Sequence, residues 1–328
     1  LQAITVMSNT VKNILINNGV FVPISVCGLG VDHINPQSID ENYVLETKSF
    51  VFLHISSCFP RKGVDLLLKA YGEAFNNNDD VSLVIKTFKN PHNVVNKLLA
   101  ELRSKEGYPH VLVIEEELDD FKLGSLYKQC NCLVSPSFGE GFGLPMAEAM
   151  LYEVPVITTG WGGQLDFCNS SNSWLLDYEF AYTKTHFNLC FSVWAQPLYE
   201  DLIKKLLEVY SATNEEILIK TSLAKQNIIK NFTWNKVAKK NLNFVSSFSS
   251  FSYPKTTKIA WVTSWNCRCG IASYSEHLIR YIPEMISIFA PYNDEILQEE
   301  DNNVFRSWRM NSPVEDFTCL LNKILSEG

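Results

Sequence analysis

The chain has 328 residues, of which 46% are hydrophobic, so it is long enough for two domains with substantial cores. Its formal net charge of −8 argues against general nucleic-acid binding. No apolar run reaches the roughly 18 residues typical of a membrane-spanning helix. The nine cysteines are scattered, and the two close pairs have one-residue spacing, unlike zinc sites. We therefore expect reduced, buried cysteines in a cytoplasmic protein.

Short apolar runs alternate with helical patterns from residue 50 to residue 159. The expected strands, each buried on both faces, are residues 50–55, 81–86, 111–114, 132–135 and 154–158. The expected helices, with apolar residues at helical spacing, are residues 64–75, 93–104, 119–129 and 145–152. This alternation predicts an α/β fold with a doubly wound parallel sheet, in which ligands sit at the carboxyl ends of the strands.

The rest of the chain divides into two patterns. Residues 195–250 read as amphipathic helices. From residue 258 the α/β pattern starts again, with a strand over 258–263, a loop over 264–270, a helix over 271–281 and a strand over 286–289. We expect three parts, with bounds at 1–32, 33–250 and 251–328.

The most informative segment runs from Ser135 to Met150, directly after the expected strand 132–135. It carries Glu140 and Glu148 with seven residues between them. Its glycines let the backbone approach a ligand, and Pro145 fits the first position of a helix. The helix N-terminus offers N–H groups to an anion such as a diphosphate. One carboxylate in the loop and one in the first helical turn suit sugar hydroxyls, which are donors.

Three segments in order resemble the retaining GT-B glycosyltransferases of family 4. They are Pro60–Ala70, Glu140-Gly-Phe-Gly-Leu-Pro-Met-Ala-Glu148 and its continuation Val154–Gly163. The resemblance implies a GT-B-type, Rossmann-like donor-binding domain over residues 33–250. Residues 1–32 then resemble the tail of a truncated N-terminal GT-B domain with its interdomain turn, and residues 251–328 resemble the beginning of a second one. The chain is therefore expected to be a fragment of a tandem multi-domain glycosyltransferase.

The same resemblance assigns roles to particular residues. Lys62 and Glu140 would be catalytic, with Lys62 meeting phosphate charge and Glu140 contacting hydroxyls of the donor sugar near the reacting carbon. Glu148 would accept hydrogen bonds from the ribose hydroxyls. The other donor-binding positions would act through the backbone, and they are Gly141, Phe142, Gly143, Leu144, Gly162 and Gly163. No cofactor besides the nucleotide-sugar donor and no metal is expected, since the chain has no Asp-x-Asp.

Each of these assignments has a plain structural alternative. The glutamate pair could be a solvated loop acid and an acid beside a helix dipole. Lys62 could be a solvated surface lysine, and Gly162-Gly163 an ordinary turn between a strand and a helix. Arg61 is expected to point elsewhere. His54 either touches the nucleotide or is a hydrogen-bonded core histidine.

One feature of the family pattern is missing from this sequence. The family usually has an arginine shortly before the phosphate-binding lysine, where Ser56, Ser57 and Cys58 stand here. We expect Lys86, at the end of the strand 81–86, to supply the lost charge. Unchanged nucleotide affinity in a Lys86→Ala variant, measured by calorimetry, would contradict this expectation. The alternative is a strand-end lysine that reaches out to water.

The implied activity is retaining transfer of a sugar from a nucleotide-sugar donor, GDP-mannose or a UDP-sugar. The acceptor would be a glycan or a lipid-linked glycan, as in the synthesis of bacterial surface polysaccharides. The protein would act in the cytoplasm or at the inner face of the cell membrane, held there through parts of the parent chain that this fragment lacks. The isolated fragment is expected to be inactive because the acceptor-side half is missing.

Two other functions stay open at this point. The chain could be a non-catalytic nucleotide-sugar-binding or scaffold module of a multi-domain glycosyltransferase. It could also be a Rossmann-type oxidoreductase, but no third glycine follows Gly28-x-Gly30, which counts against a dinucleotide fingerprint.

Overall fold

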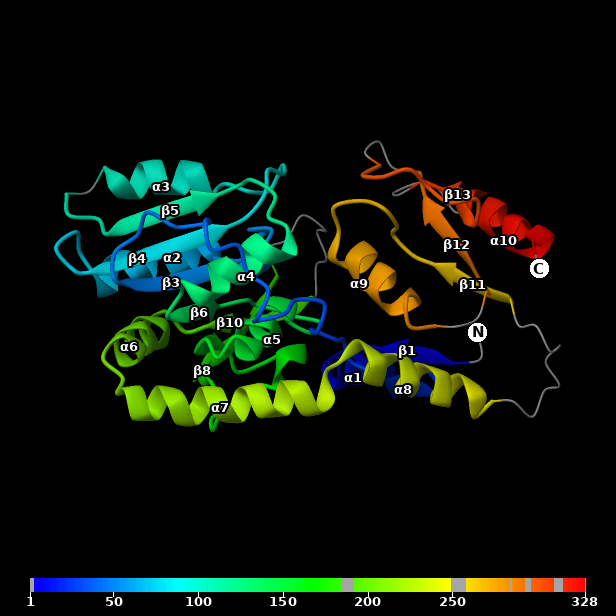
Figure 1. The fold of residues 1–328 in the computed structure, drawn as a ribbon, viewed down its shortest axis with the longest axis horizontal. Coiled ribbons are helices and arrows are strands. Elements are labelled where there is room, and N and C mark those ends of the chain that lie inside the picture. The colour runs from blue at the N-terminus through cyan, green and yellow to red at the C-terminus, as the bar shows by residue number, and fades with distance from the viewer. Residues whose placement is uncertain are drawn as a thin grey trace. The chain divides into compact units, whose positions relative to one another are not determined.

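The structure is a computed structural model, and it describes residues 3–104, 106–183, 192–248, 258–282, 285–292, 296–309 and 315–327. The chain folds into two compact units, Leu1–Thr233 and Trp234–Gly328, which are described separately (Figure 1). The expected boundary at 250/251 lies outside the described residues, and the three-part division stays a prediction. Among the described helices, none is both long enough and apolar enough to cross a membrane.

The first unit alternates strands and helices along the chain. Its described strands are β1 Ile4–Val6, β2 Ile24–Val26, β3 Phe50–Ile55, β4 Val81–Lys86, β5 His110–Ile114, β6 Cys132–Ser135, β7 Val156–Thr159, β8 Trp174–Leu176, β9 Tyr178–Tyr182 and β10 Val193–Pro197. Its described helices are α1 Asn9–Asn17, α2 Val64–Ala74, α3 Val95–Arg103, α4 Asp120–Lys128, α5 Leu144–Leu151, α6 Tyr199–Tyr210 and α7 Asn214–Asn231, with 3₁₀ helices at Pro60–Lys62 and Gly163–Asp166.

The main sheet of this unit confirms the doubly wound prediction. In the described residues it has six strands in the order β5-β4-β3-β6-β7-β8, and every pair is parallel. The chain moves outward from β3 to β5, and then returns to the other side of β3 to add β6, β7 and β8. The carboxyl ends of β3 and β6 therefore form a topological switch point, where open α/β sheets bind ligands.

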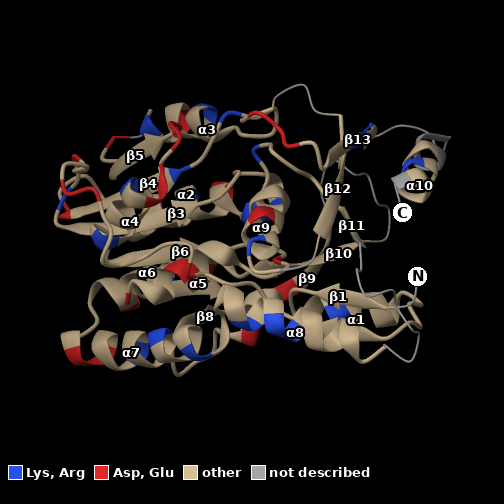
Figure 2. Cartoon of the chain, turned by 45° about the vertical axis from the view of Figure 1, so that its right-hand side comes forward, with Lys and Arg blue, Asp and Glu red and all other residues tan. Residues whose placement is uncertain are grey.

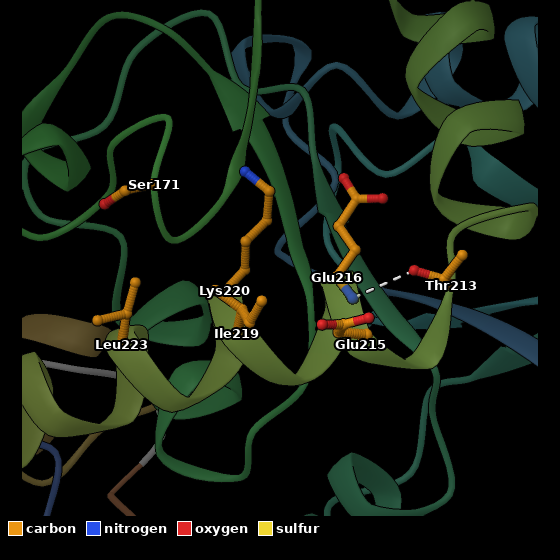
Figure 3. A pocket seen from close by; sticks show the side chains of 7 residues that line it. All are labelled: Ser171, Thr213, Glu215, Glu216, Ile219, Lys220 and Leu223. Atoms are coloured by element: carbon orange, nitrogen blue, oxygen red, sulfur yellow. Dashed lines mark hydrogen bonds between the residues drawn. The ribbon is translucent and has the colours of Figure 1, made fainter.

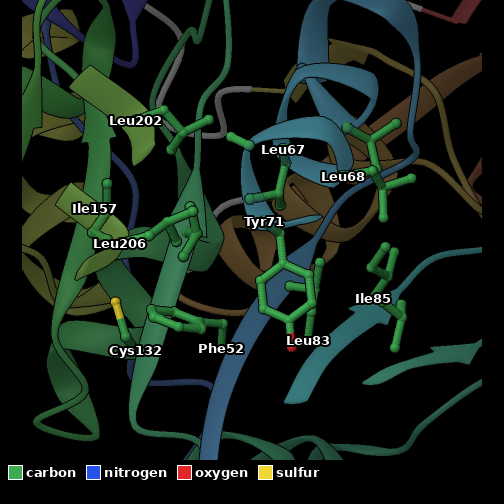
Figure 4. Close-up of a cluster of buried hydrophobic side chains, with 14 of the residues drawn as sticks. Phe52, Leu67, Leu68, Tyr71, Leu83, Ile85, Cys132, Ile157, Leu202 and Leu206 are labelled. Carbon is green, nitrogen blue, oxygen red and sulfur yellow. The ribbon is translucent and has the colours of Figure 1, made fainter. Parts of the chain in front are cut away.

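Apolar residues on both faces of β3 explain why this sheet is covered on both sides. Phe52 packs into the largest cluster, together with residues of α2 and α6 such as Leu67 and Leu206 (Figure 4). The adjacent Val51 and Leu53 point to the opposite face and are also buried. Burying a side chain of this size contributes about 1.5–3 kcal/mol each, so the sheet forms a stable platform for the loops at its edge.

Two smaller strand pairs flank the main sheet. β1 and β2 are parallel and are joined through α1, which makes a compact βαβ unit at the start of the chain. β9 and β10 form an antiparallel pair, so the expectation of helix from residue 195 is wrong for residues 195–197, and the first helix begins at Tyr199. Tyr178, Phe180 and Tyr182 alternate along β9 in the manner of a strand, and this period of two is the signal that predicts it.

The helix α7 shows how charge follows the helix dipole in this unit. Glu215 and Glu216 lie in its first turn, and Lys230 lies in its last turn (Figure 2). Thr213 caps the helix by accepting a 3.2 Å hydrogen bond from the amide of Glu216. These placements stabilise a surface helix whose packing against α5 holds α5 in place.

The second unit repeats the α/β pattern on a smaller scale. Its described strands β11 Lys258–Val262, β12 Met285–Pro291 and β13 Val304–Trp308 are parallel neighbours in that order. Its described helices are α8 Trp234–Ser246, α9 Gly270–Ile279 and α10 Glu315–Glu327. The β11–α9–β12 crossover confirms the expected start of a second Rossmann-like domain. Trp234 stacks on His277 of α9 with ring centroids 5.3 Å apart.

Candidate functional site

The loops after β3 and β6 meet at the switch point because the residue at their closest approach is a glycine without a side chain. Gly63 joins the 3₁₀ turn Pro60–Lys62 to α2 with φ +69°, a conformation that favours glycine. A Cβ at this position would lie 2.2 Å from the carbonyl oxygen of Pro136, in the loop after β6. The amide of Phe138 also donates a 2.8 Å hydrogen bond to the carbonyl oxygen of Arg61. The two loops are therefore in direct backbone contact.

This contact brings Lys62 and Glu140 together. The amino group of Lys62 donates a 2.5 Å hydrogen bond to Oε1 of Glu140, and the side chains are 15% and 8% exposed. The hydroxyl of Ser137 donates to the same oxygen at 2.7 Å. The solvated readings of Lys62 and of the loop glutamate are therefore wrong. The pair is a nearly buried cation and carboxylate at the carboxyl edge of the sheet.

The ion pair controls the protonation of Glu140. Burial alone would raise the pKa of this carboxyl group, but the charges of Lys62 and Arg61 and the hydrogen bonds from Lys62 and Ser137 outweigh burial and lower it below 4.5. Glu140 is therefore ionised at neutral pH. An ionised carboxylate accepts hydrogen bonds, as a contact to sugar hydroxyls requires.

Arg61 was expected to point elsewhere, and this expectation is wrong. Its guanidinium group donates a 3.0 Å hydrogen bond to the carbonyl oxygen of Gly139 and lies 3.7 Å from Oε2 of Glu140. The Arg61 side chain is still 45% exposed, so part of the group faces solvent. The turn Pro60–Lys62 therefore directs two successive basic side chains toward the loop after β6. The sequence alone does not show where the Arg61 side chain points, because the 3₁₀ turn sets its direction.

Glu148 lies apart from this pair, in the second turn of α5 rather than the first. The helix begins at Leu144 after Gly143, which has φ +93°, so Pro145 takes the second helical position and Glu148 the fifth. Oε1 of Glu148 lies 3.1 Å from Nε2 of His33, and Oε2 accepts a 2.7 Å hydrogen bond from the hydroxyl of Tyr127. Neither His33 nor Tyr127 belongs to a recognisable motif, so the sequence alone does not indicate them.

The two glycine loops pack against each other. The amide of Gly163 donates a 2.8 Å hydrogen bond to the carbonyl oxygen of Glu140, and a Cβ on Gly163 would lie 2.0 Å from the carbonyl oxygen of Gly141. Gly162 has φ +128°, which favours glycine. These contacts place the turn after β7 beside the loop that carries Glu140, so Gly162-Gly163 is more than an isolated turn.

The side chain of Phe142 holds this loop to the core. It is 2% exposed and packs on Phe167 and Phe232, with ring centroids 5.0 Å and 5.7 Å away. This packing therefore fixes the position of the Phe142 backbone between Gly141 and Gly143. The expected ligand contacts of the amides in this loop stay predictions.

Lys86 stands at the same edge of the sheet but faces other charges. It pairs with Ile55 at the end of β3, and its amino group donates a 3.0 Å hydrogen bond to the carbonyl oxygen of Thr87. Burial lowers its pKa from the usual 10.5, while the charges of Glu117 and Glu116 oppose the shift. The charges that act on Lys86 are therefore Glu116 and Glu117 and not Glu140. Its role toward a nucleotide stays a prediction.

His54 is a hydrogen-bonded core histidine. Its Nδ1 lies 2.8 Å from the carbonyl oxygen of Val134, and its Nε2 lies 2.8 Å from the hydroxyl of Ser56. Burial lowers the pKa of His54 to about 4, so the ring is neutral at pH 7. Nδ1 therefore donates to the carbonyl, and Nε2 accepts from Ser56. Ser56, in the segment where the family usually has an arginine, thus hydrogen-bonds a buried side chain of the core.

A surface pocket lies at a different edge of the first unit. It is lined by Ser171, Thr213, Glu215, Glu216, Ile219, Lys220 and Leu223 (Figure 3). Ser171 precedes β8, so the pocket lies toward the amino edge of the parallel sheet. Lys220 already donates to the carbonyl oxygen of Ser170 at 2.5 Å and lies over the ring of Trp174. We therefore take the carboxyl edge, with Lys62 and Glu140, as the candidate functional site.

Known proteins share both the sequence and the fold of this region. Residues 36–177 match the family model described as glycosyl transferases group 1. The serotype-specific mannosyltransferase WbdA of Escherichia coli is 34% identical over 106 residues, which are 32% of this chain and 13% of that protein. The chain thus spans a small part of the length of this curated relative.

Solved structures extend the similarity in fold. A glycosyltransferase from Rickettsia africae superposes with a TM-score of 0.60 at 19% identity, over 75% of this chain and 63% of that one. HepE from Anabaena, solved in complex with UDP and glucose, superposes with a TM-score of 0.57 at 16% identity, over 76% of this chain and 64% of that one. These neighbours confirm the GT-B-type fold. Residues 36–177 of this chain are therefore similar to the group 1 glycosyl transferases.

Proposed function

We propose that this chain is the donor-binding part of a retaining glycosyltransferase that moves a sugar from a nucleotide-sugar to a glycan or lipid-linked glycan. The observation that carries the proposal is the Lys62–Glu140 ion pair at the switch point, beside the N-terminus of α5. A cation and the positive end of a helix dipole suit a diphosphate, and an ionised carboxylate suits sugar hydroxyls. The similarity to a mannosyltransferase supports a mannose donor such as GDP-mannose for this chain, and the similarity to HepE, which was solved with UDP and glucose, supports a UDP-sugar.

The proposed mechanism asks the protein to position groups and to stabilise charge. The diphosphate would lie between Lys62 and the start of α5, where charge that develops on the leaving group is stabilised. Glu140 would hold hydroxyls of the donor sugar, and Glu148 would hold the ribose. The leaving diphosphate would help to deprotonate the acceptor hydroxyl. No metal is needed in this scheme, because Lys62 and the helix N-terminus supply the positive field.

A second candidate is a non-catalytic nucleotide-sugar-binding module of a larger glycosyltransferase. The observation that favours it is Ser56, which stands where the family usually has an arginine and which hydrogen-bonds His54. Turnover by the full-length parent would separate the two candidates. Sugar transfer by the isolated chain would contradict our expectation that the fragment alone is inactive.

Removal of the Glu148 carboxylate should weaken nucleotide binding. We expect one of GDP, UDP and ADP to bind the purified chain, and Glu148→Ala to lower its affinity by about 10–100-fold, because hydrogen bonds to a charged group are lost. Calorimetric titration measures this directly, and circular dichroism checks the fold. Glu101→Ala, at an exposed position of α3, is the matched control and should bind like the unchanged chain. Equal affinities of the Glu148→Ala and Glu101→Ala variants would contradict the ribose role.

A further inference from the structure

Both oxygens of Glu148 are held by side chains of the first unit. Nε2 of His33 lies 3.1 Å from Oε1, and the hydroxyl of Tyr127 donates to Oε2 at 2.7 Å. The side chains of His33 and Glu148 are 9% and 7% exposed, so water has little access to their contact. A carboxylate offers about four lone-pair positions, so about two remain for the hydroxyls of a ligand.

Among the side chains that contact Glu148, His33 is the one whose usual pKa lies near neutral pH. An ionised carboxylate only accepts hydrogen bonds, so Nε2 of His33 carries a proton in this contact. Burial and the charge of Glu148 raise the pKa of Tyr127 well above its usual value, so Tyr127 stays a neutral donor. Tyr152 stacks on Tyr127, and burial raises its pKa to about 12.

Negative charge surrounds His33. Within the described residues, it faces Glu148 from α5, Asp120 from the start of α4 and Asp32, its neighbour in the chain. Burial lowers the pKa of His33, but the hydrogen bond and the charge of Glu148, followed by the charges of the two aspartates, outweigh burial and raise the pKa above 6.5. A diphosphate bound nearby would add negative charge and favour the protonated ring further. By linkage, such a ligand binds more tightly when His33 is protonated.

We propose that His33 is a positioning residue for the donor, which orients Glu148 toward the two ribose hydroxyls and couples donor binding to uptake of a proton by the imidazole ring. This inference rests on the proposed function, since it takes Glu148 as the carboxylate that binds ribose. Affinity for the nucleoside diphosphate then falls as the pH rises from about 6 to about 8, the range in which histidine titrates.

Two substitutions at His33 separate positioning from titration. His33→Gln keeps an N–H donor but does not titrate, whereas His33→Phe keeps a ring and removes the donor. We expect His33→Phe to weaken binding of the nucleoside diphosphate about tenfold at pH 8 and by more at pH 6, and His33→Gln to restore most of the affinity at pH 8. The ratio of the Kd of His33→Gln to that of the unchanged chain should rise about fivefold from pH 8 to pH 6. Ionisation of the ligand phosphate affects both proteins equally and cancels in this ratio.

Calorimetry with GDP, UDP and ADP across this pH range provides the test. A constant ratio, with normal binding by the unchanged chain, would overturn the coupling to a proton. Full affinity in His33→Phe would overturn the positioning role. No binding of any nucleotide by the folded, unchanged chain would instead overturn the proposed function, and this inference with it.

A readout without nucleotide tests the contact itself. NMR titration of the His33 ring, assigned by its loss in His33→Gln, should give a lower pKa in Glu148→Gln than in the unchanged chain, because a neutral amide no longer stabilises the protonated ring. The same pKa in both proteins would overturn the contact, whatever the nucleotide experiments show.

Discussion

Lys62→Ala is expected to destabilise the protein by about 3 kcal/mol at neutral pH, the lower end of the cost of removing one partner from a buried ion pair. Glu140 would stay 8% exposed without the cation that lies 2.5 Å away. Arg61, at 3.7 Å, would compensate only in part, because its side chain is 45% exposed. The variant should also lose nucleoside diphosphate binding if Lys62 meets the phosphates. Urea unfolding measures the first effect, and calorimetry measures the second.

The pH dependence of this loss identifies its cause. In the native chain the pKa of Glu140 lies below its usual 4.5, so its contribution to stability is present above pH 4.5 and is lost as the pH falls through the folded-state pKa. In Lys62→Ala, burial is less opposed and raises the pKa of Glu140, so the variant regains stability on protonation. The difference between the two proteins should therefore shrink at acidic pH.

A second lysine–glutamate pair provides the control. Lys225 lies 2.7 Å from Glu153, but these side chains are 32% and 43% exposed. Lys225→Ala should cost no more than about 1 kcal/mol, as is usual for exposed pairs. A loss in Lys62→Ala no larger than in Lys225→Ala would contradict the buried-pair interpretation. Glu140→Gln, added to Lys62→Ala, should recover part of the lost stability because a neutral amide replaces the unpaired charge.

Gly163→Ala should be almost as damaging, for a steric reason. The added Cβ would lie 2.0 Å from the carbonyl oxygen of Gly141 and 2.7 Å from the hydroxyl of Ser8. The backbone carbonyl cannot rotate away as a side chain could, so the two glycine loops must separate. This breaks the 2.8 Å hydrogen bond from Gly163 to Glu140 and displaces the loop that carries Glu140. We expect a loss of about 3 kcal/mol in the free energy of unfolding, the upper end for overpacking.

The same loop offers a matched control at Gly139. A Cβ there would meet nothing within 4 Å, so Gly139→Ala should change the free energy of unfolding by no more than about 0.5 kcal/mol. Urea titrations of both variants give the comparison. Calorimetry should then show nucleotide binding retained in Gly139→Ala and weakened in Gly163→Ala. Similar stabilities of the two variants would contradict the proposed packing of the loops.

Local patterns in the sequence determined the fold class and several elements to the residue. The strands Phe50–Ile55, Val81–Lys86 and Cys132–Ser135 match their expected bounds, because short apolar runs between turns are typical of buried parallel strands. The expected helix 119–129 corresponds to α4, which Asp119 caps by accepting a 2.8 Å hydrogen bond from the amide of Lys122. Such features depend on neighbouring residues, so the sequence alone can predict them.

The start of a helix was harder to predict from the sequence where the backbone conformation of a glycine sets it. The left-handed conformation of Gly143 begins α5 at Leu144, one residue earlier than Pro145 suggested. Glu148 therefore lies in the second turn, deep enough for Tyr127 to reach it. A preference for proline at the first position is a tendency, and the glycine cap overrides it here.

The partners in the candidate site were decided by the tertiary structure. Lys62 and Glu140 are 78 residues apart in the chain, and His33 and Glu148 are 115 apart. The first pair meets because β6 returns to lie beside β3, and the second meets where the segment before β3 passes α5. Sequence motifs indicated which residue types a nucleotide-sugar needs. Only the order of the strands decided which of these side chains lie together, because hydrogen bonds and ion pairs depend on distance in space and not along the chain.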